Sequence, residues 1–331
     1  MLISSDEERR LLEAVVTSPD DDGPRLVLSD ALQARGEPFG EYIALEIKVS
    51  QAKVNWETWA WNLAGGARGL RETPLHALLD DVLAGTRSAN GVDLEIIAHR
   101  KRLLELEGQR SQWAAELVPG ATEVHWQRGF PTGVTVTARA LLDHTERPRS
   151  PVSSLLVTDA ELFDPALILS LPWASTVRAL ELQGGTGMGA GSEVKSTGPT
   201  QLRQLILTHQ VLRVGVLERS AAGLEHLERL RLPATVWGDG DFEALLNAPA
   251  LRELTVDSLQ GEVPISLRWR ELLTRPQLQV HFEATKITGE RFDTYAAEHA
   301  TWGSLGAFLR SREPPGGTPT RGPRWGRYRF W

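Results

Sequence analysis

A short apolar pattern, L-x-x-L-x-L, returns five times in the second half of this 331-residue chain, at intervals of 24 or 25 residues. A repeat of this length predicts a stack of similar units, each supplying one short parallel strand and a returning arm and burying its leucines against its neighbours. Five copies in register are hard to obtain by chance, so this feature decides the fold of the second half. The copies are VSSLLV at Val152, VRALEL at Val177, LRQLIL at Leu202, LERLRL at Leu227 and LRELTV at Leu251.

The period and the pattern resemble leucine-rich repeats. This resemblance implies a solenoid with a parallel sheet, and we place it at residues 121–310, including a C-terminal cap. The asparagine or cysteine that follows the strand in standard repeats is missing from most copies. The turns must therefore satisfy their polar backbone groups in other ways, and we expect an irregular solenoid within an α/β (α+β) chain.

Helical patterns fill the first fifty residues. Pro19 and the acids after it are expected to end a first helix over 6–18, and Gly36 to end a second one. Pro24 suits the first position of that second helix, with Asp22 or Gly23 as its N-cap. The expected apolar positions of the three helices are Leu11, Leu12, Val15 and Val16, then Leu26, Val27, Ala31 and Leu32, then Tyr42, Ile43, Leu45 and Ile47.

The run SPDDDGPRLVLSDALQARGEPFGEYIALEIKVSQ closely resembles the bacterial repeat-companion domain, a short N-terminal module. The resemblance covers roughly residues 1–50 and implies a helical unit ahead of repeats, but it implies no reaction, because the family is defined by architecture. Leu28 and Ala31 stand where the family has tyrosine and tryptophan. The matching positions are Pro24, Arg25, Leu26, Asp30, Leu32, Arg35, Gly36, Pro38, Gly40, Glu41 and Ile43.

Residues 51–120 look like an insertion followed by connecting helices. Trp56, Trp59 and Trp61 could form an exposed partner site, although we favour aromatic side chains folded onto neighbouring helices. One long amphipathic helix is expected over 92–118. The alternating segment EVHWQRGFPTGVTVT then predicts strands, and its W-x-R-G-F resembles the point at which the repeat-companion family passes into repeats.

Composition removes several classes of function. The chain has no cysteine, which excludes disulfides, thiolate nucleophiles and Cys-based metal sites and is compatible with a reducing compartment. Its net charge of −7 argues against general nucleic-acid binding, which needs a basic face. Because neither a signal-like N-terminus nor a long apolar segment stands out, we expect a cytoplasmic protein without a membrane partner.

The acid run at 20–22 could be a metal or catalytic cluster, or it could separate two helices. A calcium loop needs more oxygen ligands at alternating positions than this run supplies. Helix capping, together with an ion pair from Arg25 or Arg35 to Asp30, accounts for the same residues, and we favour this interpretation.

Other chemical motifs are weak. The glycines of GGTGMGAG at 184–191 are followed by a polar stretch with Gly198 and Pro199 rather than by the helix that a dinucleotide site requires. The eight histidines form no H-x-x-x-H pair, and no nucleophile elbow is present. We expect no catalytic residues, no metal and no cofactor, while an enzyme with an unrecognised site that uses Asp20 to Asp30 remains a third hypothesis.

The concave face of the predicted solenoid offers more specific candidates. Side chains between the leucines point to that face by strand alternation, and they bracket two arginines with acids. Such a mixed row suits a protein or peptide partner better than a nucleic acid. We therefore expect a noncatalytic binding scaffold. The candidate partner-binding residues are Glu181, Gln183, Gln204, Arg229, Arg231, Glu253 and Asp257.

A basic and aromatic tail, residues 311–331, supports an alternative function. Its composition predicts a linker that ends in a peptide able to dock on another protein or to fold back onto the last repeat. It could also be a segment that modifying enzymes act on, which would make the chain a substrate, leader-bearing or peptide-carrier protein of a ribosomal-peptide pathway. The candidate tail residues are Arg327, Tyr328, Arg329, Phe330 and Trp331.

Overall fold

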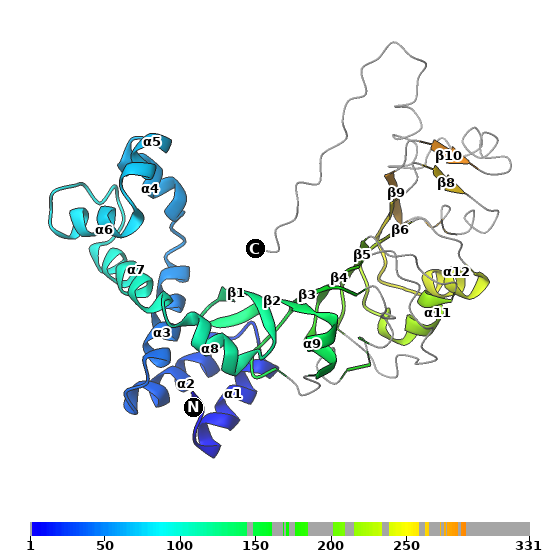
Figure 1. Cartoon of the computed structure of the whole chain (residues 1–331), viewed down its shortest axis with the longest axis horizontal. Helices are drawn as coiled ribbons and strands as arrows, with labels where there is room; N and C mark the ends of the chain where they lie inside the picture. The colour runs from blue at the N-terminus through cyan, green and yellow to red at the C-terminus, as the bar shows by residue number, and fades with distance from the viewer. Residues whose placement is uncertain are drawn as a thin grey trace, which may run out of the picture. The chain divides into compact units, whose positions relative to one another are not determined.

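The computed structural model has a mixed α/β architecture, with helices first and a mostly parallel sheet after them (Figure 1). This confirms the predicted fold class. The chain divides into two compact units, one formed by 1–119, 124–132 and 148–151 and the other by the remaining residues. The structure describes residues 2–143, 148–160, 168, 170–171, 176–184, 201–208, 215–233, 238–257, 262–264, 272, 275, 277–283 and 286–288.

Loops of two to four residues connect the helices of the first unit, except that ten residues, 84–93, separate α6 from α7. No helix in the described part of the chain is long and apolar enough to cross a membrane. The expected helix over 92–118 is two helices, because the chain breaks at Gly108 and Gln109. The helices are α1 (Asp6–Thr17), α2 (Asp22–Ala34), α3 (Pro38–Gln51), α4 (Trp56–Ala64), α5 (Ala67–Glu72), α6 (Leu75–Leu83), α7 (Leu94–Glu107) and α8 (Arg110–Leu117).

The buried face of α2 differs from the one expected. Leu26 and Val27 are 40% and 53% exposed, and Arg25 lies in the core at 1% exposure, on the same face as Leu28 and Leu32. The Arg25 guanidinium donates to the carbonyl oxygens of Pro19 and Asp21, at 2.7 and 2.8 Å. Arg25 therefore fixes the loop between α1 and α2, because it satisfies two carbonyl groups in that loop.

Two glycines allow close packing around α3. Gly40 lies against α2, where an added Cβ would be 2.6 Å from the Ser29 carbonyl oxygen. Gly129 has a φ of +82°, and an added Cβ would be 2.7 Å from the Ile43 Cα. Gly129 follows Arg128 in the two-residue turn between the neighbouring strands β1 (Ala121–Gln127) and β2 (Phe130–Thr137), and both turn residues have positive φ.

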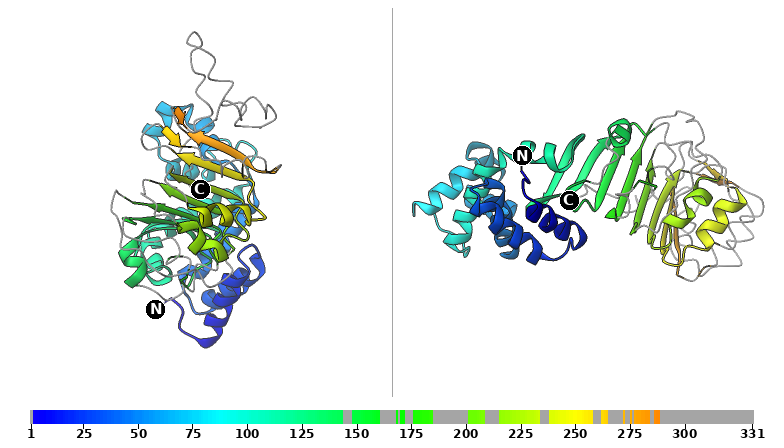
Figure 2. Two further views of the ribbon diagram at one scale, coloured as in Figure 1. Left: turned by 90° about the vertical axis from the view of Figure 1, so that its right-hand side faces the viewer. Right: turned by 90° about the horizontal axis from the view of Figure 1, so that it is seen from below.

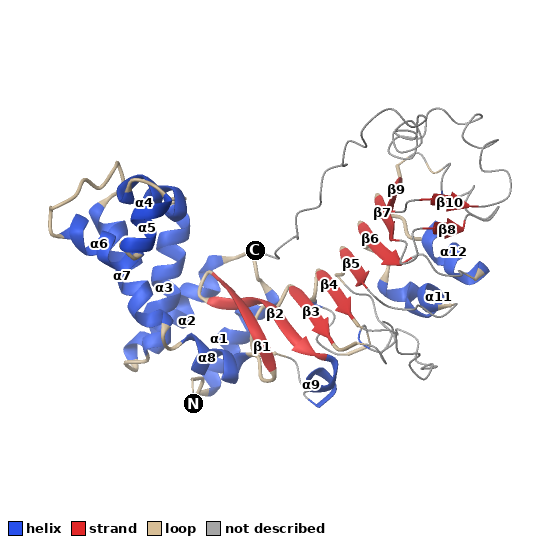
Figure 3. Ribbon diagram, turned by 45° about the horizontal axis from the view of Figure 1, so that its top comes forward, coloured by secondary structure: helices blue, strands red, loops and turns tan. Residues whose placement is uncertain are grey.

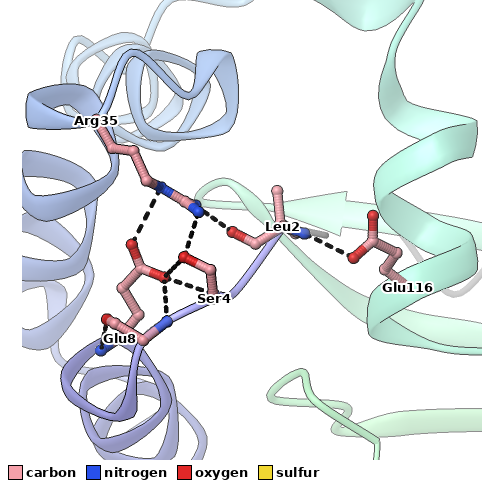
Figure 4. Close-up of polar contacts among 6 residues, drawn as sticks. Leu2, Ser4, Glu8, Arg35 and Glu116 are labelled. Carbon is pink, nitrogen blue, oxygen red and sulfur yellow. Dashed lines mark hydrogen bonds and ion pairs between the residues drawn. The ribbon is translucent and has the colours of Figure 1, made fainter.

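The segment before α1 is held by a group of polar contacts (Figure 4). Glu8 and Ser5 form a capping box, and the Glu8 carboxylate also accepts from the backbone of Ser4 at 2.7 Å. Arg35 pairs with Glu8 at 3.3 Å and donates to the hydroxyl of Ser4 and the carbonyl of Leu2. Burial raises the pKa of Glu8, but the backbone hydrogen bonds and the charge of Arg35 outweigh it, so the pKa lies below its usual value.

A second polar group lies between α3 and α8. Arg110 donates to the Tyr42 hydroxyl at 2.7 Å and to Glu46 at 3.2 Å, and its guanidinium lies over the Tyr42 ring. Burial raises the pKa of Glu46 and exceeds the opposing effect of the Arg110 charge. The pKa values of two carboxylates in the first unit are therefore shifted in opposite directions, with that of Glu8 lowered and that of Glu46 raised.

The inserted segment has a small core of its own. Trp59 is buried, and its indole N–H donates to the Ala89 carbonyl at 3.1 Å. Trp56 packs edge-on against Trp59, whereas Trp61 is 50% exposed. Two of the three tryptophans therefore pack within the segment, in agreement with the interpretation that we favoured. The buried members of this core are Trp59, Ala60, Leu78, Leu79, Val82 and Ile97.

The sheet has eight strands in the order β1-β2-β3-β4-β5-β6-β7-β9 (Figure 3). From β2 onward each neighbouring pair is parallel. In the second unit α9, α11 and α12 lie along one side of the sheet (Figure 1). The remaining elements are β3 (Ser154–Thr158), β4 (Ala179–Gln183), β5 (Gln204–Thr208), β6 (Arg229–Pro233), β7 (Glu253–Asp257), β9 (Gln279–Glu283), the pair β8 (Glu262–Pro264) and β10 (Lys286–Thr288), α9 (Ala138–Asp143), α11 (Val216–Ser220), the 3-10 helix η2 (Ala221–Gly223) and α12 (Asp239–Leu246).

Candidate binding surface

Buried leucines and valines alternate with more accessible side chains along β3 to β6, whereas in β7 Thr255 is buried between Leu254 and Val256. In β3, β4 and β5 the second and fourth residues are buried and the first, third and fifth are partly exposed. Successive strands lie side by side in the sheet (Figure 2). They are paired in register, so the accessible side chains form rows that cross the sheet. The buried residues are Leu155, Val157, Leu180, Leu182, Leu205, Leu207, Leu230, Leu232, Leu254, Val256 and Val280.

We call the sheet face opposite these buried side chains the polar face. From the sequence we expected this face to be concave and to bind a partner. Asp257 ends β7, paired in register with Pro233. The candidate tail residues 327–331 lie outside the described part of the chain. The polar face carries these candidates, partly exposed or exposed: Glu181, Gln183, Gln204, Arg229, Arg231 and Glu253.

One row of the polar face places opposite charges side by side. Arg229 in β6 is paired in register with Gln204 on one side and with Glu253 on the other. Neighbouring strands are about 4.8 Å apart, so the two charged groups are within reach of each other. Within the described residues, however, neither side chain takes part in an ion pair or a side-chain hydrogen bond. By contrast, Gln183 donates to Glu181 on β4, at 2.6 Å.

A shallow depression of about 50 Å³ lies on the same part of the polar face. It is lined by Gln204 and Ile206 from β5, by Arg229 and Arg231 from β6, and by Glu253 from β7. The depression therefore combines an aliphatic surface with amide, cationic and anionic groups. This chemistry can receive one protruding side chain of a partner, whereas the small volume argues against a buried small-molecule ligand.

The sequence pattern did not reveal β9, the sixth strand that follows the repeat alternation after β3 to β7. β9 is paired in register with β7, which places Gln279 and His281 beside Glu253 and Thr255. A signal for it exists, because Leu278 and Val280 continue the apolar alternation about 25 residues after the fifth copy. The strand escaped notice because the first leucine of the pattern is absent from this copy.

The acid run at 20–22 lies between α1 and α2 and caps the start of α2. Asp21 is the N-cap of α2, and its carboxylate accepts from the Gly23 N–H at 2.9 Å. The expected cap at Asp22 or Gly23 was therefore wrong, and α2 begins two residues before Pro24. Arg128 donates to the Asp20 carbonyl and to the Asp22 carboxylate.

The expected ion pair of Asp30 with an arginine was also wrong. Asp30 is exposed and forms no ion pair with any residue that the structure describes. Arg35 is engaged by Glu8, and Arg25 by backbone carbonyls. Elsewhere in the described ranges, no group of three or more His, Asp or Glu side chains could hold a metal ion. Of the glycine-rich stretch 184–191, only the first residue is described.

Comparison with known protein families, with curated proteins and with solved structures finds no match to this chain. The fold and the polar face define an α/β chain in which a helical unit precedes in-register parallel strands with a row of accessible polar side chains.

Proposed function

We propose that this chain is a noncatalytic scaffold that binds a protein or peptide segment through the polar face. The observation that carries the proposal is the in-register row Gln204, Arg229 and Glu253, in which the two charged side chains lie on adjacent strands but do not pair. A charge that is already engaged within the chain would have to break that interaction to bind a partner. Among the residues that the structure describes, Arg229 and Glu253 have no such interaction to break.

The mixed charge of the polar face favours a protein partner. A nucleic-acid site gains its affinity by neutralising phosphates with several cations, whereas Glu181 and Glu253 stand on strands close to the two arginines. Alternating charges of this kind give specificity and orientation to a protein interface. Ile206, which is partly exposed on the same face, would supply the apolar contact.

The same proposal covers the first unit and the location. We propose that residues 1–50 form a repeat-companion module, on the basis of the motif and of the packing that its residues require. Gly40 permits the close approach of α2 and α3, and Arg25 fixes the loop before α2. The absence of cysteine and of a membrane-spanning helix in the described residues supports a cytoplasmic location.

Charge reversal on the polar face tests the proposal. The full chain carrying R229E and R231E should lose capture of a partner that the unmodified chain retains reproducibly, by at least tenfold, because two charges change sign at the interface. The matched control is R203E with R252E, which makes the same charge change at two exposed arginines beside the strands. Unchanged capture by the polar-face variant, or equal loss in the control, would reject this surface.

A further inference from the structure

A groove on the helical side of the second unit is independent of the polar face. It lies between α11 with η2 on one side and α12 on the other, and its volume is about 400 Å³. This volume falls in the range of about 300–1,000 Å³ that is usual for ligand pockets. The residues that line the groove are Glu218, Ala221, Ala222, Leu224, Glu225, Gly240, Glu243, Ala244, Asn247 and Ala248.

The groove has an apolar floor and an acidic rim. Ala244, Ala248 and Leu224 are buried alongside it, while Glu218, Glu225 and Glu243 are exposed. None of the three glutamate side chains forms an ion pair or a side-chain hydrogen bond within the part of the chain that is described. Three unpaired carboxylates around an apolar floor attract a ligand that is both cationic and apolar.

The walls of the groove are fixed by a buried carboxylate. Asp241 in α12 accepts from the backbone N–H groups of Gly215 and Leu217 at the start of α11, at 2.7 and 2.8 Å, and from Gly238 at 3.0 Å. The side chain of Glu218 reaches α12, because a Cβ built on Gly240 would lie 3.0 Å from the Glu218 Cγ. The two walls are thus held together by specific contacts rather than by chance proximity.

The sequence contains one segment with the complementary chemistry. Residues 314–331 include no acid, four arginines and four aromatic residues. We propose that the segment 319–331 of the same chain docks in the groove, with aromatic side chains on the alanine floor and arginines against the glutamates. Cation–carboxylate contacts at the rim and apolar contacts at the floor are the two interactions that this pairing supplies.

The connection between groove and segment is long enough. Thirty residues, 289–318, separate the last described strand from the segment. At about 3.3–3.6 Å per residue a fully extended chain of that length spans about 100 Å. Tethering also raises the effective concentration of the segment to the millimolar range, so weak contacts suffice for occupancy. Because this inference does not involve the polar face, it stands or falls separately from the proposed function.

Photo-crosslinking in the full chain tests the proposal. A photoreactive phenylalanine derivative replaces Ala222, an exposed residue of the groove, and the matched control replaces Ala34, an exposed residue of α2. After irradiation and proteolysis, mass spectrometry should find peptides from 319–331 joined to position 222 and not to position 34. When a mixture of isotopically light and heavy chains is irradiated, each crosslinked product should contain two light or two heavy peptides, because the segment docks in the groove of its own chain.

Charge variants separate groove binding from chance proximity. E218K with E225K and E243K should reduce the crosslink at least tenfold, whereas E13K with E57K and E123K, three exposed glutamates of other elements, should leave it unchanged. Raising the salt concentration to 1 M should also reduce it, since the Debye length falls from about 10 Å to about 3 Å. The proposal would be overturned if no peptide from 319–331 were joined to position 222. It would also be overturned if light and heavy chains were crosslinked to each other, or if the groove variant left the crosslink unchanged.

Discussion

The carboxylate of Asp241 in α12 accepts a hydrogen bond from the backbone N–H of Leu217 in α11, at 2.8 Å. The same buried side chain also accepts from Gly215 and Gly238, so one residue satisfies the starts of two successive helices. Asp241 therefore links the starts of α11 and α12, because its carboxylate accepts hydrogen bonds from backbone N–H groups at both.

Removing that carboxylate should destabilise the second unit. D241A leaves several buried N–H groups without an acceptor, each costing about 1–3 kcal/mol, so we expect a loss of about 3 kcal/mol or more. Urea unfolding measures it through the shift of the midpoint. H226A, a change at an exposed residue of the same unit, should stay within about 0.5 kcal/mol. A D241A protein as stable as H226A would show that the hydrogen bonds to Asp241 do not stabilise the fold.

A methyl group at Gly129 should be costly. The residue has a φ of +82°, which residues with a side chain rarely adopt, and an added Cβ would lie 2.7 Å from the Ile43 Cα. We expect G129A to lower the free energy of unfolding by more than 1 kcal/mol, roughly the value for Ala at an incompatible positive φ. G36A is the control, because Gly36 also has positive φ but an added Cβ would have no atom within 4 Å. The difference in unfolding free energy between the two variants measures the packing cost at Gly129 alone. Equal losses of stability in both variants would show that close packing against Ile43 adds no cost.

The stabilising effect of Glu8 should disappear in acid. Its pKa is lowered in the folded protein, so the folded state releases the proton more readily than the unfolded chain, whose glutamate pKa is about 4.3. The stabilisation is present above that value and is lost as the pH falls through the lower, folded pKa. The loss of stability in E8Q should therefore be larger at pH 7 than at pH 3 in urea titrations. E7Q, at an exposed position, should show no such trend.

Glu46 should show the opposite dependence. Its pKa is raised by burial, so the folded state holds the proton more tightly than the unfolded chain does. The contribution of Glu46 becomes less favourable as the pH rises from about 4.3 through the folded pKa. Stability measured for E46Q relative to the unmodified chain should accordingly improve between pH 4 and pH 7. A constant difference would mean that Arg110 fully compensates the burial.

Sequence pattern predicted the strands better than the helix faces, for a physical reason. Along each of the strands β3 to β7 successive side chains point to opposite faces of the sheet. Each leucine of the pattern therefore marks a buried position, as at Leu180 and Leu205. In α2 the decisive side chain is Arg25, which is charged and yet buried because it satisfies two loop carbonyls. Hydrophobic periodicity assigned the adjacent Leu26 and Val27 to the core instead, and both are exposed.

The sequence predicted which residues share the polar face, but it did not predict how their side chains interact. Alternation alone placed Glu181, Arg229 and Glu253 on one face, since it depends only on the backbone. That Arg229 and Glu253 are paired in register but do not form an ion pair depends on side-chain rotamers, which no pattern encodes. The contribution of Asp241 was also hidden, because two of the N–H groups that donate to its carboxylate, those of Gly215 and Leu217, lie 26 and 24 residues earlier in the chain.

The most direct test of the account is photo-crosslinking from the polar face in the cells that produce the protein. A photoreactive residue at Ile206, which lines the depression, should form an adduct with one discrete protein or peptide. The same residue at the neighbouring exposed Arg203 should not, and adding R229E with R231E to the Ile206 variant should reduce the adduct at least tenfold. If no adduct forms at Ile206, or if the same adduct forms equally at Arg203, the polar face is not a binding surface.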